Sequence, residues 1–420
     1  MYEKKYLAML LATTVLCGST MAVSADETTY SGESATVAVD SNFNSLATDL
    51  SGLIISIPYG KTMQYVDTDV AKLPFKLTNL DKFIESRTVI IDRYDLKHKL
   101  AEVGINDKLD LISLTHGVSL ADTFWVKEEN SRYQWSDVSP YQSARQFDIS
   151  WFFENMSNKQ AYIGLPDYST DGNFPKCWVN VENKKYLVKC GTSGAYNAGL
   201  EPLSEILFTQ LADTLGFSNY VKYERTDVDY TKFSKEYKVS GLVRETIDID
   251  ENKRFSSMCE CFTDENKGLV TAKELGLTNI ESVIRFAREH CESWKDICNI
   301  YLCDALGMNE DRHNGNIGFY FNTDTYEVLD VAPMYDNNLS LLCYYDDRID
   351  LQDYISQLRA KSGDAFEVLG KKMLAYLPEK RDAVEQISKS FEFREPFLVK
   401  NDRVQLLSDV VRGNAKRILK

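Results

Sequence analysis

Short apolar runs of strand length mark the middle of the chain. Residues 176–179 and 186–189 flank a polar turn, which predicts a β-hairpin. A helix is expected next, because Pro202 stands in its first turn and Gly216 follows its last apolar position. Another strand is expected over residues 238–244. The central region is therefore predicted to be rich in strands.

Helical periodicity dominates the remainder. Apolar residues recur at three- and four-residue steps over 294–305 and stop at Gly307, which predicts a buried helix. Residues 317–321 and 327–331 predict a second pair of strands, and residues 351–420 return to helical patterns. A strand-rich region followed by a helical region predicts an α+β fold.

Four segments follow from these patterns. Residues 1–50 form an N-terminal segment that has the features either of a secretory signal or of strands. Residues 51–160 form an N-terminal module with helical patterns around 80–103. Residues 161–263 hold the predicted strands and the first long helix, and residues 264–420 hold the remaining helices and two polar loops.

Composition and charge exclude several classes of function. The 420 residues include 63 Asp and Glu but only 48 Lys and Arg, giving a formal net charge of −15. Direct contact with nucleic acid is therefore not expected. The 9 cysteines and 4 histidines combine at no zinc-site spacing, which predicts reduced, mostly buried thiols. Beyond the N-terminal segment, no apolar stretch is long enough for a membrane helix.

Two polar loops carry the candidate chemistry. Asp311 and Asn316 are five positions apart just after the predicted buried helix, and Asp336 follows the second strand pair. Protein kinases use this spacing for a catalytic aspartate and a metal-binding asparagine. Asp311 is thus the candidate catalytic base, while Asn316 and Asp336 are candidate Mg²⁺ ligands through hard oxygen atoms. A plain polar turn is the alternative, but the spacing, the strand pair and Asp336 together favour a site.

A lysine and a glutamate further upstream suit the phosphates of a nucleotide. Lys189 ends an apolar strand and is a candidate for binding the α- and β-phosphates of ATP, although many strand lysines are solvated edge charges. Glu205 lies on the following helix and is the first choice as its ion-pair partner. Glu201, at the start of that helix, fits an interaction with the helix dipole instead.

The segment ahead of the hairpin fits a phosphate-covering loop. Ser169, Gly172 and Lys176 belong to this polar stretch and are candidate nucleotide-binding residues. A single glycine is equally typical of an ordinary surface turn.

These stretches together resemble the HipA-like kinase family, the toxin kinases of bacterial toxin–antitoxin pairs and their relatives. The likeness covers residues 160–345. Its motifs are Ser169-x-x-Gly172-x-x-x-Lys176, Tyr186-Leu187-Val188-Lys189, Glu201-Pro202-x-x-Glu205, Asn309-x-Asp311-Arg312-His313-x-x-Asn316 and Ala332-Pro333-Met334-Tyr335-Asp336-Asn337. In one departure, Asn338 stands where many relatives have glycine. Because asparagine tolerates a left-handed backbone, the geometry of this loop is expected to be kept.

The resemblance implies a bilobal protein-kinase-like fold, with a β-rich N-lobe at 161–263 and a helical C-lobe at 264–420. It implies Mg²⁺- and ATP-dependent phosphorylation of Ser or Thr on a protein target. Autophosphorylation is implied at Ser169, with Thr170 as the alternative acceptor, and an antitoxin partner is left open. Two other interpretations stay open: a kinase-like enzyme acting on a lipid or small molecule, and an exported binding protein without enzymatic activity.

The N-terminus and the candidate chemistry indicate different compartments. Lys4 and Lys5, the apolar stretch 6–23 and the small residues before Asp26 have the form of a cleavable secretory signal. The β-branched residues within that stretch favour strands instead. An enzyme that consumes ATP works where ATP is, so a cytoplasmic location is expected, with export as the alternative.

Overall fold

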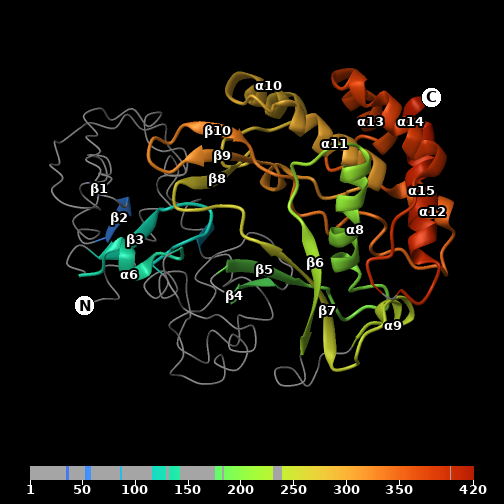
Figure 1. Ribbon diagram of the computed structural model, residues 1–420, viewed down its shortest axis with the longest axis horizontal. Helices are drawn as coiled ribbons and strands as arrows, with labels where there is room; N and C mark the ends of the chain where they lie inside the picture. The colour runs from blue at the N-terminus through green and yellow to red at the C-terminus, as the bar shows by residue number, and fades with distance from the viewer. Residues whose placement is uncertain are drawn as a thin grey trace.

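The computed structural model describes residues 35–36, 53–57, 86–87, 116–128, 132–141, 176–181, 184–229, 239–397 and 399–420. Helices and antiparallel strands are both abundant in these residues (Figure 1), which confirms the α+β class. The predicted bilobal arrangement and the four segment boundaries stay predictions.

A four-stranded antiparallel sheet forms the centre of the described chain. It contains β4 (Lys176–Val181), β5 (Lys184–Cys190), β6 (Tyr223–Asp229) and β7 (Lys253–Glu260), in the order β4-β5-β7-β6. Strands β4 and β5 form the predicted hairpin, with Lys176 directly opposite Lys189. Because opposed residues in antiparallel strands point to the same face, these two lysines share one face of the sheet.

The two faces of this sheet have different partners. On the face of Lys189, Leu187, Tyr223 and Cys259 pack against Ile206 of helix α8. The opposite face carries a separate apolar cluster, which contains Val179, Val188, Cys190 and Val228. The period-two alternation of strand β5 therefore directs Lys189 toward α8.

Helix α8 (Glu201–Thr214) confirms the prediction made from Pro202 and Gly216. Pro202 lies in its first turn, and Gly216 follows its end with a φ of 67°, a left-handed conformation that favours glycine. Most of the helix is buried, including the carboxylate-bearing Glu205. In Figure 1, α8 lies between the four-stranded sheet and the C-terminal helices.

A second, three-stranded sheet has the order β10-β9-β8. It contains β8 (Lys267–Thr271), β9 (Gly318–Asn322) and β10 (Val328–Val331), and its β9–β10 pair is the predicted second strand pair. Gly268 is required where β8 meets β9, because a Cβ there would collide with the ring of Phe321. The sheet carries the loop that ends at Asp336.

The helices after β8 form the main hydrophobic core. They are α10 (Ile280–His290), α11 (Lys295–Gly307), η4 (Asn314–Asn316), α12 (Leu351–Gln357), α13 (Phe366–Tyr376), η5 (Pro378–Lys380), α14 (Arg381–Ser390) and α15 (Arg403–Leu419). Helix α11 is the predicted buried helix, and its Ile297, Leu302 and Leu306 have essentially no exposed surface. None of the helices in the described ranges has the length and apolar character needed to cross a membrane.

The strand predicted over residues 238–244 is wrong. Helix α9 (Gly241–Thr246) lies there instead. The Ser240 side chain accepts a hydrogen bond from the Val243 N–H at 3.3 Å, which caps the helix. Gly241 also lets the ring of Tyr196 approach closely, because a Cβ at this position would overlap that ring. The cap and this contact outweigh the strand propensity of the apolar residues.

Part of the N-terminal module docks beside the second sheet. Strands β1 (Ala35–Thr36), β2 (Leu53–Ile57) and β3 (Trp125–Glu128) form a third sheet, and α6 (Trp135–Val138) packs near it. The Leu269 N–H of β8 donates to the Ala121 carbonyl at 2.7 Å. The Ser139 hydroxyl donates to Glu265 at 2.9 Å.

The described cysteines behave as the sequence predicts. Of the cysteines whose side chains the structure describes, Cys261 is half-buried and the others, at positions 190, 259, 291, 298, 303 and 343, are buried.

Candidate active site

Lys189 lies between two carboxylates from distant parts of the chain. Its Nζ is 2.5 Å from Oε1 of Glu205 and 2.8 Å from Oδ1 of Asp336. Lys189 is 7% exposed and Glu205 is fully buried, so this is an interior ion pair. The predicted pairing of Lys189 with Glu205 is confirmed.

Glu201 lies in the first turn of α8, where the sequence places it, and has its own hydrogen-bond partners. It accepts hydrogen bonds from the N–H and hydroxyl of Thr192 and from the Tyr344 hydroxyl, the last at 2.8 Å. Glu201 therefore fixes the loop ahead of α8 and has no contact with Lys189 in the described structure.

Backbone pairing places Asp336 beside the sheet. The Val221 N–H donates to the Met334 carbonyl, and the Met334 N–H donates to the Asn219 carbonyl, both at 2.9 Å. The Asp336 N–H then donates to the Tyr223 hydroxyl at 3.2 Å. These bonds attach the end of the second sheet to the start of strand β6.

The left-handed residue in this loop is Asp336 itself, with a φ of 55°. Neither Asn337 nor Asn338 has a positive φ, so the tolerance of asparagine for a left-handed backbone is not used here. Both are buried instead, and the Asn337 N–H donates to Oε2 of Glu205 at 3.0 Å. Tertiary hydrogen bonding thus places the left-handed residue two positions before Asn338.

The charged groups in this cluster shift one another's pKa values. Burial lowers the pKa of Lys189, but Asp336 and Glu205 raise it by more, so it lies well above its usual value. Burial raises the pKa of Asp336, but Lys189 and the nearby Lys176 lower it by more, so the net shift is downward. Burial raises the pKa of Glu205 by more than Lys189 lowers it. Lys189 and Asp336 are therefore charged at neutral pH.

Arg312 connects the two loops. Its guanidinium makes a bidentate ion pair with Asp304, at 2.9 and 3.1 Å, and both side chains are almost fully buried. Its Nη1 donates to the carbonyls of Asn316 and Tyr335, at 3.1 and 2.5 Å, and its Nη2 donates to the Asn337 side chain at 2.5 Å. The planar guanidinium of Arg312 thus hydrogen-bonds to both loops and holds the Asp311 loop against the Asp336 loop.

Asp311 lies on the solvent side of this junction. Its backbone N–H donates to the Asn309 side chain at 3.0 Å, which fixes the turn after α11. Its Oδ1 lies 2.9 Å from Nζ of Lys361, whereas Oδ2 has only His313 Nε2 nearby, at 3.9 Å. The side chain is 26% exposed. Among the described residues, Oδ2 therefore has no partner within hydrogen-bonding distance, and the side chain is partly open to solvent.

Asn316 and Asp336 each present an oxygen suited to a divalent cation. Asn316 uses its Nδ2 to donate to the Asp311 carbonyl at 3.0 Å, and this bond does not involve its Oδ1. Among the described residues, neither Asn316 Oδ1 nor Asp336 Oδ2 has a hydrogen-bond partner. Hard oxygens in small number fit Mg²⁺, which keeps several waters and binds substrate phosphates. The predicted metal ligands thus fit the ion.

The predicted phosphate-binding residues are only partly described. Lys176 lies on β4 opposite Lys189 and close enough to Asp336 to lower its pKa. Ser169, Thr170 and Gly172 lie outside the described residues.

Residues 337–350 connect Asp336 to α12 and are fixed by hydrogen bonds to several helices. The Ser204 hydroxyl of α8 donates to the Ser340 carbonyl, and the Leu341 N–H donates to the Gly307 carbonyl of α11, both at 2.8 Å. Leu341 and Leu342 are buried with φ values of 49° and 54°. Arg403 of α15 binds the Leu342 carbonyl. A strained conformation that persists in this way is held by its surroundings.

Sequence reasoning gave no role to three residues that organise the site: Asp304, Arg312 and Lys361. Asp304 stands between Cys303 and Ala305 in the buried part of α11, and an acidic residue at such a position signals a buried partner. Lys361 carries no such signal, because it contacts Asp311 across fifty positions of sequence.

Comparisons with known proteins give distant likenesses. The chain matches no protein-family model and no curated protein. Similar solved structures include the proinflammatory kinase CtkA of Helicobacter pylori, which is 16% identical with a TM-score of 0.39 over 60% of this chain and 90% of that one. HipA, from a toxin–antitoxin complex of Shewanella oneidensis MR-1 with HipB and operator DNA, is 12% identical with a TM-score of 0.42 over 80% and 86%. A Golgi casein kinase with Mn/ADP bound is 12% identical with a TM-score of 0.28 over 60% and 71%. TM-scores this low establish neither the fold family nor the activity of this chain.

Proposed function

We propose that this protein is an Mg²⁺- and ATP-dependent kinase that transfers phosphate to a Ser or Thr hydroxyl of a protein target. The observation that carries the proposal is the ion pair of Lys189 with Glu205 and Asp336, joined through Arg312 to the loop of Asp311 and Asn316. Phosphoryl transfer depends on positioning and charge stabilisation, and these residues supply both.

Each residue has a distinct part in the reaction. Lys189, held by Glu205, binds the α- and β-phosphates of ATP, and Lys176 adds a second positive charge on the same face of the sheet. Asn316 and Asp336 hold Mg²⁺, which neutralises phosphate charge when bound.

Asp311 orients the acceptor hydroxyl. The hydroxyl oxygen forms a bond to the γ-phosphorus while the bond from that phosphorus to the β–γ bridging oxygen breaks, and ADP leaves. The hydroxyl proton passes to Oδ2 of Asp311, the oxygen that Lys361 does not engage.

A transfer assay with γ-labelled ATP tests the proposal. Wild-type protein is expected to label itself or an added protein, and Asp311→Ala is expected to bind nucleotide but to transfer no label. Asp347→Ala serves as the matched control. It removes an exposed carboxylate from the segment between Asp336 and α12, and is expected to retain transfer. Undiminished transfer by Asp311→Ala would exclude Asp311 as the base.

Mass spectrometry of the labelled protein distinguishes the acceptor classes. Phosphate on Ser169 or Thr170 supports protein phosphorylation and the autophosphorylation that the family likeness implies. If label appears only on an added lipid or small molecule, the alternative kinase-like enzyme is favoured. A protein that binds no ATP favours the non-enzymatic alternative, and sequencing of the mature N-terminus then tests export.

A further inference from the structure

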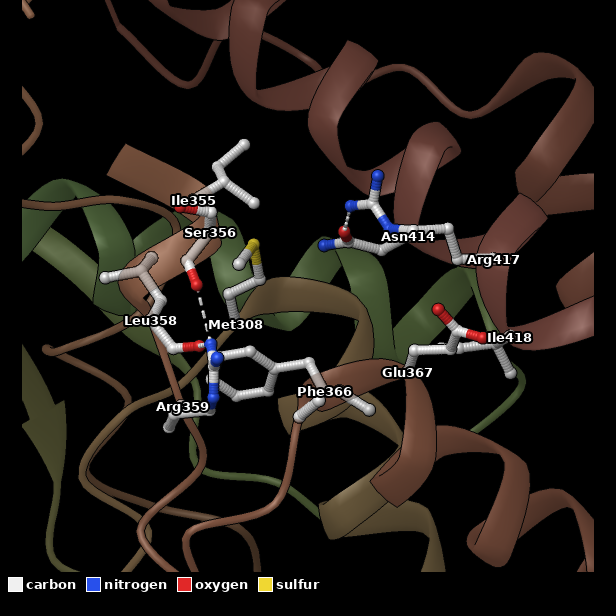
Figure 2. A pocket seen from close by; sticks show the side chains of 12 residues that line it. Met308, Ile355, Ser356, Leu358, Arg359, Phe366, Glu367, Asn414, Arg417 and Ile418 are labelled. Carbon is white, nitrogen blue, oxygen red and sulfur yellow. Dashed lines mark hydrogen bonds between the residues drawn. The ribbon is translucent and has the colours of Figure 1, made fainter. Parts of the chain in front are cut away.

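A cavity lies at the end of α11, where Met308 forms part of its lining (Figure 2). Its volume is about 140 Å³, and it is bounded by the end of α11, the α12–α13 connection, the start of α13 and the end of α15. Its apolar wall contains Ala305, Met308, Ile355, Leu358, Phe366 and Ile418. A cavity of about 150 Å³ with such a lining accepts a benzene ring. The space therefore suits one small ring or branched chain.

Arg359 and Arg417 both belong to the lining of this cavity. Arg359 uses Nη1 to donate to the carbonyls of Ser356 and Leu358, both at 2.7 Å, so its Nε and Nη2 have no partner among the described residues. Arg417 donates through Nη2 to the Asn414 side chain. Figure 2 shows these guanidinium groups on different sides of the lining. Each retains N–H donors for a ligand.

One carboxylate in the lining of the cavity reduces the net positive charge that a ligand meets. Glu367 also lines it, and its Oε1 is 2.5 Å from Nζ of Lys371 on the same helix. The hydrogen bond from Lys371 lowers the pKa of Glu367, and the charge of Arg417 adds to this shift, so this carboxylate is ionised. The lining groups Arg359, Arg417 and Glu367 thus sum to one positive charge, which complements a monoanion better than a dianion.

We propose that this cavity is a binding site for a small monocarboxylate with an aromatic ring or a short branched chain. The ring or chain contacts Met308, Leu358 and Phe366, while the carboxylate accepts hydrogen bonds from the free Nε and Nη2 donors of Arg359. The site is separate from the Lys189 cluster and uses none of its residues.

The cavity adjoins both segments that position the candidate catalytic base. Met308 is the left-handed residue that ends α11, three positions before Asp311. Arg359 lies two positions before Lys361, whose ammonium contacts Asp311. A ligand that contacts both Met308 and Arg359 therefore touches the two segments that present Asp311 and Lys361, and is expected to change the transfer rate. This second part rests on the proposed kinase function.

Binding is tested with benzoate and its neutral isostere benzamide, by isothermal titration calorimetry and ligand-observed NMR on the full chain. Benzoate is expected to bind saturably with a Kd of about 1 mM or tighter, a realistic affinity for so small a ligand. Benzamide is expected to bind about tenfold more weakly, because it has no charge for the arginines. Equal binding of the two compounds, or no saturable binding of benzoate, overturns the site.

Matched variants locate the binding. Arg359→Gln is expected to weaken benzoate about tenfold and to leave benzamide unchanged, whereas Arg417→Gln removes a charge on the other side of the cavity and is expected to weaken benzoate less. Arg381→Gln, which changes an exposed arginine on α14, is expected to have no effect. Ala365→Phe, which fills the mouth at an exposed lining position, is expected to weaken both compounds. Unchanged benzoate affinity in both the arginine and the Ala365 variants places the ligand elsewhere and overturns the proposal.

The transfer assay separates this proposal from the proposed function. Benzoate is expected to change the rate of label transfer by wild type at least twofold at saturation, and the concentration that gives half of this change is expected to be about tenfold higher for Arg359→Gln. If benzoate binds as expected but the transfer rate stays constant, the coupling is overturned and the site stands. If wild type transfers no label at all, the kinase function fails, while the calorimetric result still decides the site.

Discussion

Nζ of Lys361 lies 2.9 Å from Oδ1 of Asp311, although the two residues are fifty positions apart in sequence. An ordered turn presents this lysine. The Ala360 N–H donates to the Asp364 carbonyl at 3.0 Å, and the Gly363 N–H donates to the Ala360 carbonyl at 2.8 Å. The ammonium thus orients one oxygen of the candidate base and adds positive charge where the γ-phosphate would be transferred.

Lys361→Met is expected to lower kcat for phosphate transfer by roughly 10²-fold, since removing one preorganised charge from a transition state has an effect of this size. The KM for ATP is expected to change little, because Lys189 and Lys176 hold the other phosphates. Steady-state kinetics with γ-labelled ATP measures both constants. Lys389→Met, at an exposed lysine of α14, is the control. A kcat that both variants leave unchanged would remove Lys361 from the mechanism.

Lys189→Met is expected to destabilise the protein strongly. The change leaves the fully buried Glu205 and the partly buried Asp336 without their shared cation, which costs about 3–5 kcal/mol of unfolding free energy. Urea denaturation measures the loss. Lys184→Met on the same strand breaks only the exposed pair with Glu260 and is expected to change stability little. The double variant Lys189→Met with Glu205→Gln is expected to recover part of the loss, and no recovery would contradict the ion-pair explanation.

The contribution of Asp336 to stability is expected to disappear in acid. Its pKa is lowered on folding from an ordinary 3.8, so its stabilisation is present above that value and is lost as the pH falls below it toward the folded pKa. The difference in unfolding free energy between wild type and Asp336→Asn is therefore expected to be constant above about pH 5 and to shrink below pH 3.8. Urea titrations across pH measure it, and a difference that grows in acid contradicts the assignment.

Lys189 has the opposite dependence. Its pKa is raised on folding from an ordinary 10.5, so its stabilisation is full below that value and is lost only as the pH rises above it. Between pH 5 and pH 9 the difference between wild type and Lys189→Met is expected to stay flat, to within about 0.5 kcal/mol. A slope inside this window would show that another titrating group controls the cluster.

Arg312→Lys is expected to be disruptive despite keeping the charge. Lysine cannot form the bidentate pair with Asp304 and also reach the carbonyls of both loops, so about 2–3 kcal/mol of stability is lost. Because the carbonyl of Asn316 is one of those contacts, affinity for Mn²⁺, used as a paramagnetic probe, is expected to fall at least tenfold. Electron paramagnetic resonance titration measures this, with Arg381→Lys as the exposed control. Wild-type Mn²⁺ affinity would show that Arg312 does not position the metal ligands.

The sequence predicts those parts of the site that depend on local pattern. The hairpin before Lys189, the helix that carries Glu205 and the buried helix ahead of Asp311 each follow from spacing, a capping residue or apolar periodicity. Together they were enough to predict the pairing of Lys189 with Glu205.

The remaining features depend on contacts between distant segments. The left-handed conformation of Asp336 results from bonds to Tyr223 and Glu205 through adjacent backbone groups, and no local preference indicates it. The α9 segment has apolar residues typical of a strand, yet the Ser240 cap and the Tyr196 ring favour a helix. The contact of Lys361 with Asp311 needs the turn after α12 to reach the end of α11.

The firmly held connection between Asp336 and α12 has a thermodynamic consequence. Contacts with α8, α11 and α15 fix Ser340, Leu341 and Leu342, so the conformational entropy of this segment is lost when the chain folds. A nucleotide that arrives later meets a segment that is already ordered, and its affinity is not reduced by a disorder-to-order transition there. Hydrogen exchange of these amides should accordingly be as slow before ATP is added as afterwards.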